Sequence, residues 1–300
     1  MRIITRGDMD GLASSVLLST VEQVREIVFL HPKEAQDGNF SVTKDDIIVN
    51  LPYIKGCGLW FDHHVSEDQK AESVRTAGDA RGLYQVAPSA ARVVYNFYKN
   101  PTLDAYADML ESVDRFDSGQ LTKSDVLDPK DWILLAYTID PRTGLGPEFQ
   151  KYFRWMVEYV KEVPIEKILA HPEVKRRVDQ VRQEQAAFEG ILRANCRQDG
   201  AVVVTDLRNL PEPLPSGNRF LVFILFPEAN VETRVFWGKD KEKVVIACGH
   251  SIFKRTCNVN IGKLMSGYGG GHKGAGTCQI ESAKADATLK EIIAKLKGNK

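Results

Sequence analysis

The most constraining feature of this 300-residue sequence is an apolar run, residues 58–61, that ends in a carboxylate and two adjacent histidines, Asp62, His63 and His64. Such a run is typical of a buried strand, and the carboxyl end of a strand in an α/β sheet presents side chains to a ligand. Neighbouring residues at a strand end point to opposite sides. We therefore expect His63 to bind a metal ion and His64 to contact a substrate. The alternative interpretation is that one histidine caps the strand and the other is solvated.

A second candidate loop lies near the N-terminus, between a short strand that begins at Ile3 and a stretch with apolar residues at helical spacing. This loop, residues 6–11, carries Asp8 and Asp10 between two glycines. Doubly wound sheets bind ligands at such a loop, and carboxylate oxygens suit Mg²⁺ or Mn²⁺. The alternative interpretation is a turn in which one of the two aspartates only caps the helix.

The remaining pattern predicts an α/β protein with two domains. Strands are expected at 25–30, 46–51 and 58–64, helices at 88–98, 102–116, 132–138 and 149–160, a long charged helix at 164–197, strands at 201–205, 220–226, 231–237 and 244–248, and a helix at 258–268. The elements before the charged helix predict a parallel sheet with helices on both faces. The charged helix would link it to a smaller α/β domain.

Composition excludes several classes of partner. Forty basic and forty acidic residues cancel, so no global basic field favours long nucleic acid. The five cysteines are scattered without a Cys-x-x-Cys pair, which argues against a disulfide framework or a structural zinc site and fits a reducing compartment. The N-terminus does not read as a signal peptide, and no apolar run approaches a membrane span. We expect a cytoplasmic protein with no membrane partner, and a homodimer is possible.

A glycine run near the C-terminus provides a third motif. Gly269, Gly270 and Gly271 leave no Cβ at three successive positions, so a backbone there can approach an anion closely and offer N–H donors. His272 and Lys273 follow directly, and Lys254 and Arg255 precede the adjoining helix as possible phosphate contacts. A glycine-rich run can also be only a turn, and the basic pair only surface charge.

Together, Asp-x-Asp-Gly at 8–11, Asp62-His63-His64 and the segment 269–276 resemble the motifs of the DHH phosphoesterase superfamily with a DHHA1 domain, in its bacterial exopolyphosphatase-like branch. The resemblance implies a DHH domain at 1–163, a helical linker at 164–198 and a DHHA1 substrate-binding domain at 199–300. It also implies two metal ions, usually manganese, with a shared water that attacks phosphorus. A fourth motif would supply an aspartate, for which Asp114 fits better than Asp117.

Two positions depart from the family pattern. Arg6 stands where many relatives have a His or Asp ligand, and Asn50 stands where a bridging aspartate is usual. Two divalent ions about 4 Å apart repel by roughly 16 kcal/mol at an effective dielectric of about 20. Without the bridging carboxylate, and with a guanidinium in place of a ligand, nothing obvious offsets that repulsion. The sequence therefore predicts one ion, Mn²⁺ or Mg²⁺, rather than two.

The expected roles follow from these departures. Asp10 and His63 would hold the ion, with Asn50 or water completing its ligands, while Asp8 and Asp114 would hold Arg6 or assist a weak second ion. Arg6 would bind phosphoryl oxygens, Asp62 would orient a ligand histidine, and His64 would contact the phosphate or protonate the leaving group. We expect a metal-dependent phosphohydrolase or phosphodiesterase acting on a small phosphorylated compound, short oligonucleotide or polyphosphate in a cleft between two domains. The alternative is a phosphate-ligand sensor with impaired chemistry on the same fold.

Overall fold

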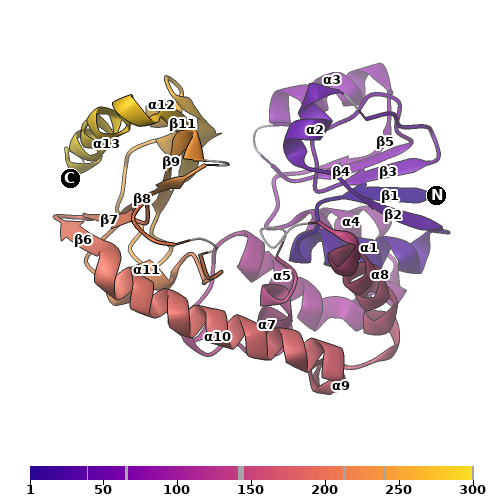
Figure 1. Ribbon diagram of the computed structural model, residues 1–300. Coiled ribbons are helices and arrows are strands. Elements are labelled where there is room, and N and C mark those ends of the chain that lie inside the picture. The colour runs from indigo at the N-terminus through magenta and orange to yellow at the C-terminus, as the bar shows by residue number, and fades with distance from the viewer. Residues whose placement is uncertain (39, 65–66, 141–144, 212–213, 239–240, 299–300) are drawn as a thin grey trace. The chain divides into compact units, whose positions relative to one another are not determined.

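The computed structural model describes residues 1–38, 40–64, 67–140, 145–211, 214–238 and 241–298 (Figure 1). The chain divides into two compact units. Unit 1 comprises residues 1–120 and 129–179, and unit 2 comprises 121–128 and 180–300. Helix α10, Pro172–Asn195, begins in unit 1 and ends in unit 2. The division thus falls inside the charged helix that the sequence assigns to a linker.

Unit 1 contains a five-stranded parallel sheet in the order β2-β1-β3-β4-β5. Its strands are β1 Arg2–Thr5, β2 Glu26–Phe29, β3 Asp46–Val49, β4 Leu59–Asp62 and β5 Arg81–Tyr84. All residues of β3 and β4 are buried, because helices cover both faces of the sheet. The predicted parallel sheet is confirmed, although the sequence did not indicate β5.

Two layers of helices enclose this sheet (Figure 1). One face carries α1 Met9–Val21, α4 Ala90–Tyr98, the 3-10 helix η2 Pro101–Tyr106, α5 Ala107–Asp117, α7 Asp131–Tyr137, α8 Pro147–Glu162 and α9 Ile165–Ala170, whose apolar residues form the larger core. The other face carries α2 Pro32–Asp37 and α3 Asp68–Ala77 over a smaller core. Most of the helices expected between 88 and 160 are present within a few residues of their expected bounds.

The strand order fixes where a ligand can bind. From β1 the chain moves to one side to form β2, and it then returns to the other side of β1 to form β3, β4 and β5. In doubly wound sheets the carboxyl ends of the strands at this reversal form the binding crevice. Gly11 allows helix α1 to start close to β1, because a Cβ on it would lie 2.1 Å from the carbonyl oxygen of Arg6. The loop 6–11 is therefore held against the end of β1.

Unit 2 contains a six-stranded mixed sheet in the order β10-β11-β9-β8-β7-β6. Its strands are β6 Cys196–Asp199, β7 Val202–Asp206, β8 Val231–Trp237, β9 Lys243–His250, β10 Gly269–His272 and β11 Ala275–Glu281. Its helices are α6 Lys123–Leu127, α11 Leu221–Leu225, α12 Ile261–Met265 and α13 Ser282–Lys297. Apolar residues of α12 and α13 share a core with one face of this sheet.

The strand predicted at 220–226 is wrong, because this segment forms helix α11. A short apolar run satisfies the pattern of a buried strand and that of a buried helix equally well. Here Asn218 starts a helical turn, since its side-chain oxygen accepts a hydrogen bond from the N–H of Phe220 at 2.9 Å and its carbonyl accepts one from Leu221 at 3.1 Å. The two strands that flank β8 are instead β7 and β9.

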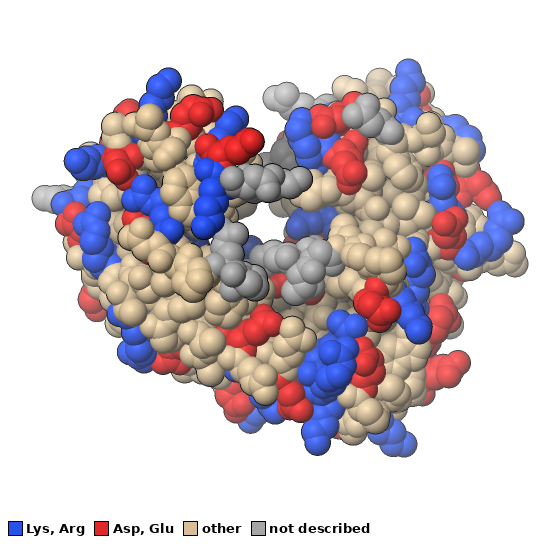
Figure 2. Space-filling view, in the orientation of Figure 1, with Lys and Arg blue, Asp and Glu red and all other residues tan. Residues whose placement is uncertain are grey.

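The surface carries no charge segregation on the side shown in Figure 2, where basic and acidic side chains alternate over both units. This mixture agrees with a formal net charge of zero. Among the described residues, no helix combines the length and the apolar character needed to cross a membrane.

Candidate metal and phosphate site

Asp10 is a fully buried carboxylate of the site. Its side chain has no exposed surface, and its two oxygens each accept a 2.8 Å hydrogen bond, from the N–H of Ala90 and from the N–H of Ala91. These donors belong to the first turn of α4, where unpaired N–H groups and the helix dipole favour an anion. Burial, and then the charges of Asp117 and Asp8, nevertheless raise the pKa of Asp10 well above its usual range. A cation at this carboxylate would offset that cost.

His63 presents a nitrogen lone pair toward two carboxylates. Its Nδ1 lies 3.0 Å from the carbonyl oxygen of Ala87, which can only accept, so Nδ1 carries the proton. When the ring is neutral its lone pair is therefore on Nε2, which is 3.7 Å from Oδ2 of Asp10 and 3.3 Å from Oδ2 of Asp117. This buried nitrogen makes no hydrogen bond within the described part of the chain. A histidine whose second nitrogen is fixed by a carbonyl is the usual arrangement of a metal ligand.

Asp117, at the end of α5, completes this group. Ligand atoms of Asp10, His63 and Asp117 lie within 4.8 Å of one another. Burial raises the pKa of Asp117 above its usual range. The sequence ranked this residue second for the fourth motif.

Asp114, the residue ranked first, lies elsewhere. Its Oδ1 accepts a 2.6 Å hydrogen bond from the hydroxyl of Ser89, and its Oδ2 accepts one of 2.7 Å from Nε of Arg92. Both oxygens are thus occupied by protein donors. The structure brings Asp117, and not Asp114, to the group with Asp10 and His63.

Arg6, Asp8 and Asn50 form a separate network beside this group. Oδ1 of Asp8 accepts from the N–H of Gly11 and from Nδ2 of Asn50, both at 2.9 Å, and its Oδ2 lies 3.1 Å from Nε of Arg6. Because the Asp8 carboxylate only accepts, the amide of Asn50 must turn its NH₂ to Asp8. Its Oδ1 is buried and has no hydrogen-bond partner among the residues that the structure describes. Asn50 adopts φ +57°, a left-handed conformation that asparagine tolerates.

Asp62 orients His64 and not the histidine that the sequence suggested. Its fully buried carboxylate accepts from Nδ1 of His64 at 2.7 Å and from the N–H of His63 at 2.9 Å, both on Oδ1. Burial alone would lower the pKa of His64, but the hydrogen bond to Asp62 and the nearby carboxylates outweigh it and raise that pKa. The partly exposed imidazole of His64 is therefore protonated more readily than an ordinary histidine, which suits contact with an anion or donation of a proton.

The glycine run of unit 2 is a strand and not a turn. Strand β10 pairs antiparallel with β11, and all four of its residues are exposed. A Cβ at Gly269 would lie 2.3 Å from the carbonyl oxygen of Thr277, and one at Gly271 would lie 2.4 Å from that of Ala275. At Gly270 a Cβ would meet no atom within 4 Å among the described residues. Two glycines thus serve the packing of the strand, and only Gly270 lacks such a structural reason.

Of the predicted basic contacts in unit 2, Lys254 pairs with Glu228 at 2.8 Å, and Nε of Arg255 donates to the carbonyl oxygen of Ile252 at 3.1 Å. The exposed His272 accepts on Nδ1 from the N–H of Gly274 at 3.2 Å.

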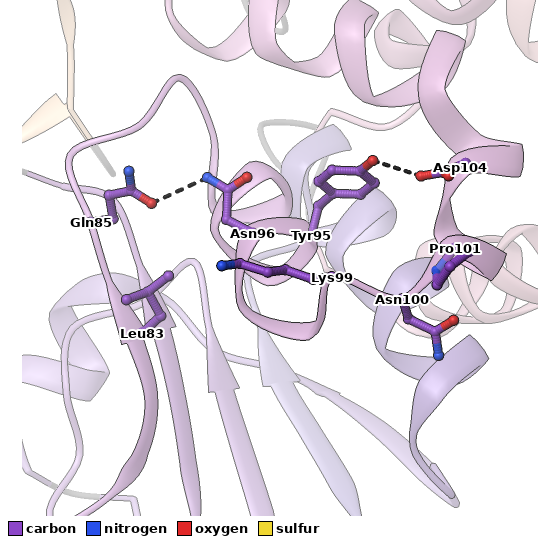
Figure 3. A pocket seen from close by; sticks show the side chains of 8 residues that line it. All are labelled: Leu83, Gln85, Tyr95, Asn96, Lys99, Asn100, Pro101 and Asp104. Carbon is purple, nitrogen blue, oxygen red and sulfur yellow. Dashed lines mark hydrogen bonds between the residues drawn. The ribbon is translucent and has the colours of Figure 1, made fainter.

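Unit 1 contains a pocket of about 560 Å³ (Figure 3). Its lining residues are Leu83, Gln85, Tyr95, Asn96, Lys99, Asn100, Pro101 and Asp104. Two hydrogen bonds join lining residues to each other, from Nδ2 of Asn96 to Oε1 of Gln85 at 3.2 Å and from the hydroxyl of Tyr95 to Oδ1 of Asp104 at 2.6 Å. The pocket contains none of the residues that the sequence selected.

The whole chain resembles a solved phosphodiesterase. The pGpG-specific phosphodiesterase PggH from Vibrio cholerae is 37% identical, with a TM-score of 0.84, and the match covers 100% of this chain and 99% of that one. This chain belongs to the DHH phosphoesterase superfamily. RecJ from Thermus thermophilus, solved with Mn²⁺, is 14% identical with a TM-score of 0.58 over 98% of this chain and 52% of its own, which shows the fold alone. No family model and no curated protein sequence matches the chain.

The protein is therefore a phosphoesterase of this type. The sequence selected Asp10, His63 and His64 from their places beside strand ends. It missed the carbonyl of Ala87, which holds His63, and the hydroxyl of Ser89, which holds Asp114. Backbone groups carry no sequence signal, and a serine before a helix reads only as an N-cap.

Proposed function

We propose that this protein is a metal-dependent phosphodiesterase that hydrolyses a short linear dinucleotide such as pGpG. The observation that supports this most is the 37% identity to the pGpG-specific enzyme over the full length of both chains. Addition of water across the single phosphodiester of pGpG breaks the bond between phosphorus and the 3′-oxygen and gives two molecules of GMP. A substrate of this size requires no extended basic surface, in agreement with the net charge of zero.

Asp10, His63 and Asp117 would hold the ion. They fit a hard divalent cation, because two carboxylates and one neutral imidazole suit Mn²⁺ or Mg²⁺ and because the buried Nε2 of His63 has no hydrogen-bond partner in the described ranges. The raised pKa values of Asp10 and Asp117 point the same way, since burial raises both pKa values and the charge of Asp117 adds to the shift of Asp10. When bound, such an ion supplies Lewis-acid activation of water and neutralises phosphoryl charge.

One ion suits the site better than two. Protein donors already occupy both oxygens of Asp8, and Arg6 cancels its charge. Two uncompensated carboxylates then remain, Asp10 and Asp117, which balance a single divalent ion. The unpartnered Oδ1 of Asn50 is a neutral oxygen that can accept from a water molecule or join the ligands of that ion.

The remaining side chains would act on the phosphate. Nε of Arg6 pairs with Asp8, and the terminal nitrogens of its guanidinium would bind phosphoryl oxygens. His64, held by Asp62 through Nδ1, would donate the proton on Nε2 to the departing 3′-oxygen. The hairpin of β10 and β11 in unit 2 would contribute further substrate contacts through Gly270 and His272.

The test is metal binding and turnover measured on the same stripped protein. We expect calorimetry with Mn²⁺ to give one ion per chain. We expect the loaded protein to convert pGpG to GMP faster than it hydrolyses polyphosphate, phosphoadenosine phosphate or a longer oligonucleotide. His64→Ala is the matched control, because it should keep the ion and lose turnover. An ion bound without turnover of any of the four compounds would contradict the proposal and favour a protein that only binds a phosphate ligand.

A further inference from the structure

We propose that Asp114 is a positioning residue for the metal site, acting through Ser89 and Arg92 at the start of helix α4. This inference rests on the proposed metal-dependent function and assigns a role to residues that make no contact with the ligand group itself. It follows from the way one short segment of the chain, residues 87–91, holds the site together.

Three side chains of the site are tied to this segment. The carbonyl of Ala87 fixes the Nδ1 proton of His63 at 3.0 Å and so aims its Nε2. The N–H groups of Ala90 and Ala91 hold the two oxygens of Asp10 at 2.8 Å. Any shift of the segment would therefore move two of the proposed metal ligands at once.

The third ligand is tied to the same segment through Asp114. Ser89 is fully buried and caps α4, accepting from the N–H of Arg92 at 3.0 Å and donating to Oδ1 of Asp114 at 2.6 Å. Nε of Arg92 donates to Oδ2 of Asp114 at 2.7 Å. Asp114 and Asp117 are both on α5, one turn apart. The contacts of Asp114 thus fix the last turn of α5, which carries Asp117, against the first turn of α4.

The arrangement explains why the half-buried carboxylate of Asp114, one turn from Asp117, is not part of the proposed ligand group. The two carboxylates differ in charge balance, because neutral backbone N–H groups hold Asp10 whereas the Arg92 guanidinium cancels the charge of Asp114, which therefore attracts a cation less. Positioning contacts of this kind lower metal affinity about 10- to 100-fold when they are removed. A bond that only stabilised the fold would change the melting temperature and leave the affinity of the folded protein unchanged.

The experiment compares Asp114→Asn and Ser89→Ala with the wild-type protein, in the full chain. The measurements are the Kd for Mn²⁺ by calorimetry at a temperature where each variant is folded, and the melting temperature without metal. We expect Mn²⁺ affinity to fall about 10- to 100-fold in both variants. We expect Ser89→Thr, which keeps the hydroxyl, to recover most of the loss. Should Ser89→Ala fail to fold, Asp114→Asn alone decides.

Tyr95→Phe is the matched control. It removes a 2.6 Å hydrogen bond from the same helix α4 to Asp104 (Figure 3), which involves neither Ser89 nor any proposed ligand. It should leave Mn²⁺ affinity unchanged. A wild-type Kd in Asp114→Asn, or an equal loss in Tyr95→Phe, would overturn the positioning role while leaving the proposed function intact. A wild-type protein that binds no Mn²⁺ would overturn both.

Discussion

The two halves of the site differ in how their polar atoms are satisfied. In one half, both oxygens of Asp8 are paired with protein donors, and Arg6 cancels its charge. In the other half, Asp10 and Asp117 keep raised pKa values and His63 keeps a buried nitrogen with no hydrogen-bond partner in the described part of the chain. A buried polar atom without a partner costs free energy unless a ligand supplies one. The charge of Asp8 is balanced within the first half, although Oδ1 of Asn50 there has no hydrogen-bond partner among the described residues, whereas we propose that a cation balances the charges of the second half.

The largest expected effect is that of Asp117→Asn. Removing one of three ligand groups should lower Mn²⁺ affinity by more than about 100-fold, the upper range for contacts that only support a ligand. Turnover should fall in parallel. Calorimetry and a pGpG assay on the same preparation measure both effects. Mn²⁺ affinity equal to that of the wild-type protein would show that Asp117 is not a ligand.

The same variant should stabilise the protein without metal. Folding raises the pKa of Asp117, so its stability contribution is present below the unfolded pKa, about 3.9, and is lost as the pH rises through the folded pKa. Asparagine removes that loss. We expect the metal-free variant to melt higher than the wild-type protein at pH 8, and the difference to vanish near pH 4.

Asp114→Asn should instead melt at a lower temperature than the wild-type protein, because the hydrogen bonds from Ser89 and Arg92 to this carboxylate are weakened.

Placing metal-ligand side chains at positions 6 and 50, in the half that contains Asp8, tests this comparison directly. Arg6→His with Asn50→Asp would restore an imidazole and a carboxylate at the two departing positions, and aspartate tolerates the left-handed backbone of residue 50. We expect calorimetry to give two Mn²⁺ ions per chain in place of one. Asn50→Asp alone is the control, because Arg6 would then pair with the added carboxylate. One ion in the double variant, with unchanged turnover, would show that the charge balance does not set the stoichiometry.

Asp46, at the amino end of strand β3, should show the reverse dependence of stability on pH. Burial would raise the pKa of Asp46, but bonds from Arg2 and Thr43 outweigh it and lower that pKa. Its stabilisation is therefore present above the unfolded pKa and is lost as the pH falls through the folded pKa. Asp46→Asn should cost about 1–3 kcal/mol at pH 7 and almost nothing at pH 2–3. Denaturant titrations at both pH values measure the difference, and an equal loss at both would contradict it.

The sequence predicted what depends on local order in the chain. Asp10 and His63 follow buried strands, and parallel strands bring their carboxyl ends together whatever the rest of the packing. Asp114 and Asp117 lie one turn apart and share one face of α5, so the choice between them depends on where α5 sits along its axis. That position depends on core packing with distant helices, in which Met109 and Val113 of α5 take part.

Two segments of the fold were predicted wrongly for different reasons. Strand β5 was missed because Gly82 weakens the strand pattern, although its missing Cβ is what allows the backbone to lie against the carbonyl of Trp60, 2.1 Å from where a Cβ would stand. Helix α11 was predicted as a strand because five apolar residues satisfy both periods, and the hydrogen bonds of Asn218 decide between them.

The smallest expected effect on stability separates packing from binding in the glycine hairpin. The Cβ added by Gly270→Ala would lie within 4 Å of no other atom in the described structure. The free energy of unfolding should therefore change by less than about 0.5 kcal/mol. Gly271→Ala should destabilise clearly, because its Cβ would lie 2.4 Å from a backbone oxygen. If the hairpin contacts the substrate, Gly270→Ala raises the KM for pGpG while leaving the Mn²⁺ Kd unchanged. An unchanged KM would restrict the hairpin to a structural role and place every substrate contact that matters for affinity elsewhere.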